Sequence, residues 1–223
     1  MTRKQVAEKL ASLFEGRAMQ GYARWKVRTD PAYAATLENL RGRTTPLLDL
    51  GCGVGLLAFF LREHGYTAPV TGIDFDRRKI DIARRISNRY RDLQFLTGDA
   101  RDPFPPPPRD VVILDLLQYF DAEAQRAILT RAAKCGGVVI IRQGLRDGSW
   151  RHRVTVFVDA LGRAVRWMKA ERVNFPTRED MLAPFANDFE VEVRPLWGRT
   201  PYNNYLFVCR PSSRRSSSGT TSS

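Results

Sequence analysis

A glycine-rich turn directly after a short apolar run is the feature that most constrains how this chain folds. Residues 47–55 read Leu-Leu-Asp-Leu-Gly-Cys-Gly-Val-Gly, and a helix-like apolar segment follows. Glycines at such a turn let the backbone approach a ligand that side chains would block. A dinucleotide-binding turn reads G-x-G-x-x-G, whereas here the third glycine, Gly55, comes one residue early. The turn therefore predicts a strand–turn–helix unit with a binding role, but departs from the dinucleotide pattern.

Segments typical of strands and helices alternate after this turn. Strands are expected at 47–50, 70–74, 93–97, 111–115 and 137–142, and helices at 54–63, 77–90 and 122–133. Strands separated by helices of this length favour βαβ units, with a parallel sheet covered by helices on both faces. The expected fold class is α/β, doubly wound and Rossmann-like.

The two ends of the chain depart from this alternation. Near the N-terminus, Asp30-Pro31 predicts the start of a helix that runs to about Leu40. Later, a helix is expected over 153–169, and Thr177 begins a second one with a capping box. The segments 189–195 and 205–210 predict two antiparallel strands that close the sheet. The Ser-rich residues 211–223 are expected to form a disordered tail.

Acidic residues recur where the predicted strands end. Asp74 ends the second strand, Asp99 follows the third, and Asp115 closes the fourth. In open α/β sheets, ligands bind at the carboxyl ends of the strands, and a carboxylate in the place of Asp74 accepts ribose hydroxyls. Any one of these residues alone would be explained as a helix cap, but the set in register indicates a nucleoside-binding site.

The compact turn and the strand-end acids resemble class I S-adenosylmethionine-dependent methyltransferases over essentially the whole chain to Arg210. The resemblance implies S-adenosyl-L-methionine as cofactor, strand order 3-2-1-4-5-7-6 and an antiparallel seventh strand. It implies that Phe75 packs on adenine, Asp99 accepts from the adenine amino group and Asp115 borders the methionine end. The implied cofactor-binding residues are Asp49, Gly51, Cys52, Gly53, Asp74, Phe75, Asp99, Ala100 and Asp115. It also implies one domain over 1–210, with a helical cap (1–44), a core (45–143), a substrate-side insert (144–188) and a closing hairpin (189–210).

The methyl acceptor is harder to derive, because in-line positioning supplies much of the rate and a base is needed only for a poorly acidic acceptor. The fourth strand continues as Asp115-Leu-Leu-Gln, which lacks the proline pair typical of enzymes that methylate exocyclic amino groups. Whether oxygen, carbon or nitrogen accepts the methyl group stays open.

More distantly, residues 22–33, 141–144, 150–153 and 200–204 resemble methyltransferases of bacterial aryl-polyene pigment gene clusters. That resemblance implies secondary metabolism and a phenolic, aryl or polyketide-type acceptor, free or carrier-bound. Where that family has a His, a Glu and a Gly, this chain has Gln118, Gln143 and Arg199. If that His is the general base, this chain must use another group or none. We expect a substrate site at Tyr22, Trp25, Tyr119, Arg142, Trp150 and Tyr202, since aromatic walls suit a planar acceptor. The catalytic candidates are Tyr119, Arg142, which would bind a carboxylate or orient Tyr119, and His152, expected to be exposed.

The net charge of +12 leaves the partner class open. The arginines are spread along the chain without a basic block, so we favour a small molecule over RNA; an RNA methyltransferase and a cofactor-binding module without transferase activity remain alternatives. Aminopropyl transfer would need a more acidic acceptor site.

Three cysteines and two histidines predict neither a disulfide framework nor a metal site. With no apolar run near 20 residues and no export signal, a cytoplasmic protein is expected; the oligomeric state is not indicated.

Overall fold

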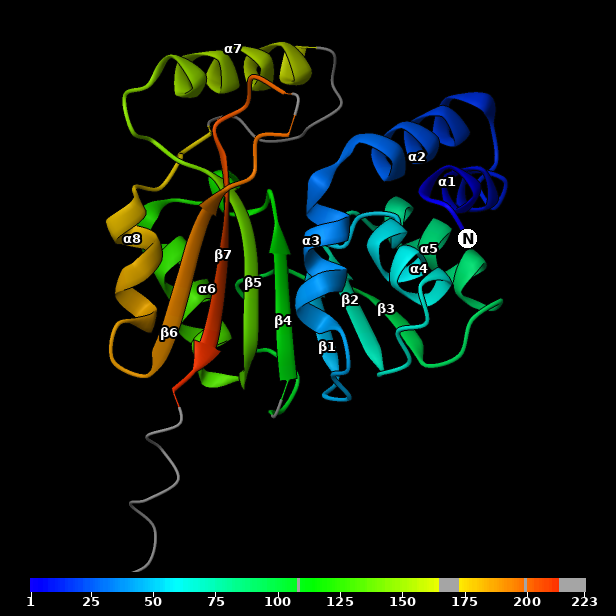
Figure 1. Ribbon diagram of the computed structural model, residues 1–223, viewed down its shortest axis with the longest axis horizontal. Helices are drawn as coiled ribbons and strands as arrows, with labels where there is room; N and C mark the ends of the chain where they lie inside the picture. The colour runs from blue at the N-terminus through cyan, green and yellow to red at the C-terminus, as the bar shows by residue number, and fades with distance from the viewer. Residues whose placement is uncertain (108, 165–172, 199, 213–223) are drawn as a thin grey trace, which may run out of the picture.

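A seven-stranded mixed sheet forms the centre of the molecule (Figure 1). The computed structural model describes residues 1–107, 109–164, 173–198 and 200–212. The strand order is β3-β2-β1-β4-β5-β7-β6, and β7 runs antiparallel to both of its neighbours, as predicted. The strands are β1 (Leu47–Leu50), β2 (Val70–Asp74), β3 (Leu93–Thr97), β4 (Arg109–Leu114), β5 (Gly136–Gly144), β6 (Phe189–Pro195) and β7 (Asn204–Pro211).

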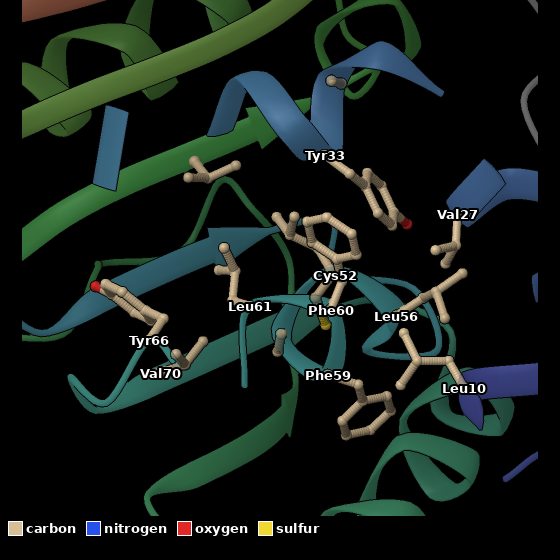
Figure 2. Packing of buried hydrophobic residues seen from close by; sticks show 14 of the residues in the cluster. Leu10, Val27, Tyr33, Cys52, Leu56, Phe59, Phe60, Leu61, Tyr66 and Val70 are labelled. Atoms are coloured by element: carbon tan, nitrogen blue, oxygen red, sulfur yellow. The ribbon is translucent and has the colours of Figure 1, made fainter. Parts of the chain in front are cut away.

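Helices cover both faces of this sheet because successive strand residues point to opposite sides. One buried cluster joins Val112 and Ile140 to the N-terminal helices and to α4 (Leu56–Glu63) and α5 (Arg77–Ser87). Figure 2 shows its aromatic centre, Phe59 and Phe60, beside Tyr33. The other cluster joins Val111 and Ile141 to α6 (Ala122–Lys134), α8 (Arg178–Leu182) and the short 3₁₀ helix η2 (Ala183–Phe185). The central strands β1, β4 and β5 are therefore buried on both sides, as in a doubly wound fold.

Three helices precede the sheet: α1 (Arg3–Ala11), α2 (Arg17–Thr29) and α3 (Pro31–Leu40). Asp30 caps α3, since its carboxylate accepts from the backbone N–H of Ala32 at 2.9 Å, and Pro31 stands at the first helical position as predicted. Helix α2 was not predicted, because Gly21 interrupts its pattern. Ala23 and Val27 are nevertheless fully buried against the core, and this packing outweighs the low helix propensity of glycine.

Several predicted boundaries were wrong by a few residues. Helix α4 begins at Leu56 and not at 54, because Gly55 has a left-handed backbone (φ 77°). Helix α5 ends at Ser87, three residues before the predicted end at 90. Strand β4 ends at Leu114, and Asp115 follows it with a φ of 55°, which a non-glycine residue seldom adopts.

The region after β5 is only partly described. Helix α7 (Trp150–Ala164) begins three residues before the predicted 153, and the rest of the helix expected to 169 lies outside the described residues. The predicted capping box at Thr177 is present, with Asp180 as its partner. The expected tail lies almost entirely outside the described residues. Among the residues that are described, no helix is both long enough and apolar enough to cross a membrane.

Candidate active site

A cavity of about 450 Å³ opens at the carboxyl ends of β1, β2 and β4. All nine residues predicted to bind the cofactor line it: Asp49, Gly51, Cys52, Gly53, Asp74, Phe75, Asp99, Ala100 and Asp115. Tyr22, Tyr119 and Arg142, predicted for the acceptor, line the same cavity. The parallel sheet thus brings together strand ends that are far apart in the sequence, and we call this space the large cavity.

The glycine turn is fastened to the end of β2 by Asp74. One carboxylate oxygen of Asp74 accepts from the backbone N–H of Gly53 and the other from that of Asp76, both at 2.9 Å. Gly51 and Gly53 have φ values of 75° and 57°, and a Cβ on Gly51 would lie 3.0 Å from the side chain of Leu116. Glycine is therefore favoured at position 51 by its left-handed backbone, and a larger residue would also have to displace the end of the Leu116 side chain.

Asp49 is a buried carboxylate, and one of its two oxygens lacks a hydrogen-bond partner among the described residues. Its side chain is 3% exposed, and Oδ2 has no hydrogen bond to any described residue. Burial, with the charge of Asp74 as a smaller cause, raises the pKa of Asp49 to about 7. Burial also raises the pKa of the neighbouring Cys52 thiol, next to the same two carboxylates. A cationic group in the large cavity would relieve this local excess of negative charge.

The opposite end of the cavity is more open. Asp99 accepts from the backbone N–H of Arg101 at 2.8 Å and from its guanidinium, and these hydrogen bonds lower the pKa of Asp99. Phe75 is 59% exposed although it lines the cavity. A large ring left uncovered at a cavity wall is suited to stacking on a planar ligand.

Arg142 lies in the wall of the large cavity and forms ion pairs with Asp30 and Asp115; we call these three residues the bridge. Its two terminal nitrogens donate to Asp30, at the start of α3, and to Asp115. Burial opposes ionisation of Asp30, but Arg142 and then Lys26 outweigh it and lower the pKa of Asp30 to about 2. The carboxylates that Arg142 binds are therefore the chain's own; its expected role in orienting Tyr119 stays a prediction.

A second, smaller cavity of about 100 Å³ adjoins this bridge; we call it the small cavity. It shares Lys26, Asp115 and Arg142 with the large cavity. The other lining residues are Trp25, Thr29, Asp30, Pro31, Thr200, Tyr202 and Asn204. Two of the predicted acceptor residues, Trp25 and Tyr202, are thus found here, between the end of α2 and the segment that joins β6 to β7.

Two predicted residues line neither cavity. Trp150 is exposed on α7, where its ring lies 4.7 Å from the guanidinium of Arg151. His152, predicted to be exposed, is partly buried, with its ring edge-on to Phe175. Their positions at the start of a helix gave no indication of which way the side chains point.

Sequence analysis missed residues that the fold brings to the site. Lys26, Asp30 and Tyr33 line the cavities from α2 and α3. Asp30 was interpreted as a helix cap and as part of the segment 22–33 that carries the more distant resemblance; its contact with Arg142 was not predicted, although one carboxylate oxygen serves both the cap and Arg142. A buried arginine with no partner close in sequence was the one available signal that a distant carboxylate had to be nearby.

Gln118, which stands where the resembled family has a His, faces neither cavity. Its side-chain oxygen accepts from Gln143 Nε2 at 2.7 Å, and its side-chain nitrogen donates to the backbone oxygen of Asp115 at 3.0 Å. Gln143 also accepts from the backbone N–H of Leu117. This buried amide network holds the loop after β4, and with it Asp115, in place.

Comparisons with known proteins agree with this geometry. Residues 47–136 match the family described as a methyltransferase domain. The chain is 35% identical over 94 residues to a cypemycin N-terminal methyltransferase of Streptomyces sp., covering 42% of this chain and 36% of that protein. It is 40% identical over 63 residues to a ubiquinone biosynthesis O-methyltransferase of Coxiella burnetii, covering 25% and 26%. The chain thus matches only about a third or less of the length of these curated relatives.

Among solved structures, the magnesium protoporphyrin IX methyltransferase of Synechocystis PCC 6803 with bound SAH superposes with a TM-score of 0.65. It is 17% identical and covers 93% of this chain and 94% of its own, so this likeness concerns the fold. Residues 47–136 thus match a methyltransferase domain, and the sheet order is the one that the resemblance to class I S-adenosylmethionine-dependent methyltransferases implied. The comparisons also support the predicted cofactor, S-adenosyl-L-methionine.

Proposed function

We propose that this protein transfers a methyl group from S-adenosyl-L-methionine to a small aryl, phenolic or polyketide-type acceptor. One observation carries the proposal. Nine residues from the ends of four strands line one cavity, and Lys26, Asp115 and Arg142 line both this cavity and a second one. A donor site and an acceptor site that meet at one boundary are the arrangement that group transfer needs.

The residues of the large cavity fit each part of this cofactor. Asp49, with its unpartnered buried oxygen, suits the cationic methionine end. Helix α4 has no side-chain cap at Gly55, so the N–H groups of its first turn are available to a carboxylate. We assign the ribose hydroxyls to Asp74 and the adenine ring to Phe75 and Asp99.

When bound, the cofactor supplies an activated methyl group on a positively charged sulfur. The chain's own contribution is to position the acceptor in line with that group and to exclude water. Tyr22 and Tyr119 line the large cavity together with Arg142, and aromatic faces favour a neighbouring cation. His152 lies outside both cavities, so we assign it no part in proton transfer.

We propose the acceptor class from two supports. The wall of the small cavity includes the rings of Trp25, Pro31 and Tyr202, which suit a planar group. The relative in Coxiella burnetii is, by its name, an O-methyltransferase of ubiquinone biosynthesis. We also propose that residues 1–210 act as one unit, with 1–44 and 144–188 covering the core on the acceptor side.

Isothermal titration calorimetry with S-adenosylhomocysteine, followed by a methyl-transfer assay with radiolabelled S-adenosylmethionine and a panel of phenols, tests the proposal. We expect one binding site per chain and label transferred to at least one phenol. Binding without transfer to any acceptor would favour a cofactor-binding module. Failure to bind S-adenosylhomocysteine would overturn the proposal altogether.

A further inference from the structure

The small cavity is the part of the molecule whose chemistry the proposed function leaves unspecified. It has four charged side chains in its wall: Lys26, Asp30, Asp115 and Arg142. Lys26 pairs with Asp30 at 2.8 Å, and Arg142 pairs with both Asp30 and Asp115. Two cations and two anions therefore cancel within the wall, and no cation is left over for an anionic ligand.

The bridge is also too deeply buried to be rearranged without cost. The side chains of Arg142 and Asp30 are 6% and 5% exposed. An anionic ligand that took Arg142 for itself would leave the carboxylate of Asp30 buried and deprived of its main partner. Breaking a buried ion pair in this way is strongly unfavourable. The charged wall thus disfavours a carboxylate or phosphate in the small cavity.

Asp115 is the exception among the four, because part of it remains accessible. Its side chain is 33% exposed, it lines both cavities, and Arg142 engages only Oδ2. The ion pair with Arg142 holds its carboxylate, and the hydrogen bond from Gln118 to its backbone carbonyl holds its backbone. Asp115 Oδ1 is therefore a pre-positioned acceptor for a hydroxyl proton at the boundary of the two cavities.

The size of the small cavity limits what can enter it. An apolar cavity of about 150 Å³ in another protein accommodates one benzene ring. At about 100 Å³, the small cavity holds most of one ring, so a larger acceptor would have to extend beyond it. The aromatic side chains of Trp25 and Tyr202 are placed to contact such a ring.

From these observations we infer that the small cavity is the acceptor subsite, and that it takes a single uncharged phenolic ring whose hydroxyl donates to Asp115. This inference rests on the proposed function, because it assumes that the large cavity holds the methyl donor. It goes further in naming the charge of the ligand, its size and the residue that orients its hydroxyl.

Calorimetry on the full chain saturated with S-adenosylhomocysteine tests the inference with two nearly isosteric probes. These are 4-hydroxybenzamide, which is neutral, and 4-hydroxybenzoate, which is anionic. We expect the amide to bind at least about tenfold more tightly, because the carboxylate loses its hydration and gains no cation. Equal binding, tighter binding of the benzoate, or binding of neither probe to a protein that does bind S-adenosylhomocysteine overturns the inference and leaves the cofactor assignment intact.

Variants locate the probe within the molecule. Trp25→Ala and Tyr202→Ala should each weaken binding of the amide by about tenfold, the effect of losing one ring contact. Tyr202→Phe keeps the ring and should bind the amide as the wild type does, as should Phe157→Ala, which removes an exposed aromatic ring of α7 outside both cavities. S-adenosylhomocysteine affinity, which reports an intact fold, should be unchanged in all four. Undiminished amide binding by both alanine variants at the small cavity would place the ring elsewhere and refute the assignment.

Discussion

The donor half and the acceptor half of this site are built in different ways. The donor half consists of strand ends and the turns that follow them, so Gly53, Asp74 and Asp99 are placed by the parallel sheet itself. The acceptor half depends on contacts between distant segments, such as the pair between Asp30 and Arg142, which are separated by 112 positions. Sheet topology thus fixes one half, and a few buried side-chain contacts hold the other together.

Removing the charged bridge should have the largest effect on the acceptor half. Arg142→Met leaves Asp115 without its cation and Asp30 with Lys26 alone, and we expect it to lower the free energy of unfolding by about 3–5 kcal/mol. Urea denaturation at pH 7 measures this loss. Arg78→Met, whose exposed side chain pairs with Asp76, serves as a control and should cost less than about 1 kcal/mol. A bridge variant as stable as this control would show that the bridge does not organise the acceptor half.

The bridge also predicts a pH dependence. The pKa of Asp30 is lowered from 3.8 to about 2. Its stabilising contribution is therefore fully present above about pH 4 and is lost as the pH falls through 2. The difference between wild type and Arg142→Met should accordingly narrow below pH 4, and a constant difference down to pH 2 would argue against the ion pair.

In the donor half, Asp74→Asn should have the largest effect on the cofactor. The carboxylate accepts from Gly53 and Asp76, and we propose that it also accepts from the ribose. Loss of one charged hydrogen bond should weaken S-adenosylhomocysteine binding by about 1.5–3 kcal/mol, measured by calorimetry. Asp81→Asn, on the exposed side of α5, is the matched control and should bind normally. Undiminished binding by Asp74→Asn would contradict the ribose assignment.

Asp49→Asn tests the donor half in a second way, because a buried carboxylate without a ligand lowers the free energy of unfolding. Its pKa is raised from 3.8 to about 7, so its contribution to stability is present below pH 4 and lost as the pH rises through 7. The Asn variant should therefore be more stable than wild type at pH 8, by on the order of 2 kcal/mol, with no gain at pH 4. It should also bind the cofactor more weakly. A gain in stability that does not depend on pH would refute this explanation.

The smallest expected effect concerns the segment that walls the small cavity. Arg151 lies between the rings of Trp150 and Trp197 and donates to the backbone oxygen of Thr200 at 2.8 Å. Arg151→Leu should lower stability by about 1 kcal/mol and weaken binding of the neutral phenol, while cofactor binding stays unchanged. Arg153→Leu, exposed on the same helix, should change none of these. Equal effects of the two variants would argue against a role for this stacking.

The same contrast explains what could be predicted from the sequence. Strands β1, β2 and β3 were predicted to the residue, and all nine predicted cofactor residues line one cavity. This was possible because strand ends in a parallel sheet meet at one edge, so a local pattern also fixes a distant neighbour. Whether these residues bind the cofactor is a matter for the measurements above.

The acceptor half could not be derived in this way. Helix α2, Lys26 and the role of Asp30 were missed because helix packing and side-chain direction are set by tertiary contacts, which leave little trace in a single sequence. Trp150 was placed in the site on its residue type, yet it lies outside both cavities. Arg142 was singled out correctly as a buried cation, but its partners lie on α3 and in the loop after β4, which no spacing rule connects to it.

A crystal structure of the complex with S-adenosylhomocysteine tests the central claim most directly. The account predicts adenine against Phe75, the ribose hydroxyls on Asp74, and the sulfur directed towards Asp115 at the boundary of the two cavities. An adenosyl group bound outside the large cavity, or one with its sulfur turned away from Asp115, would contradict it.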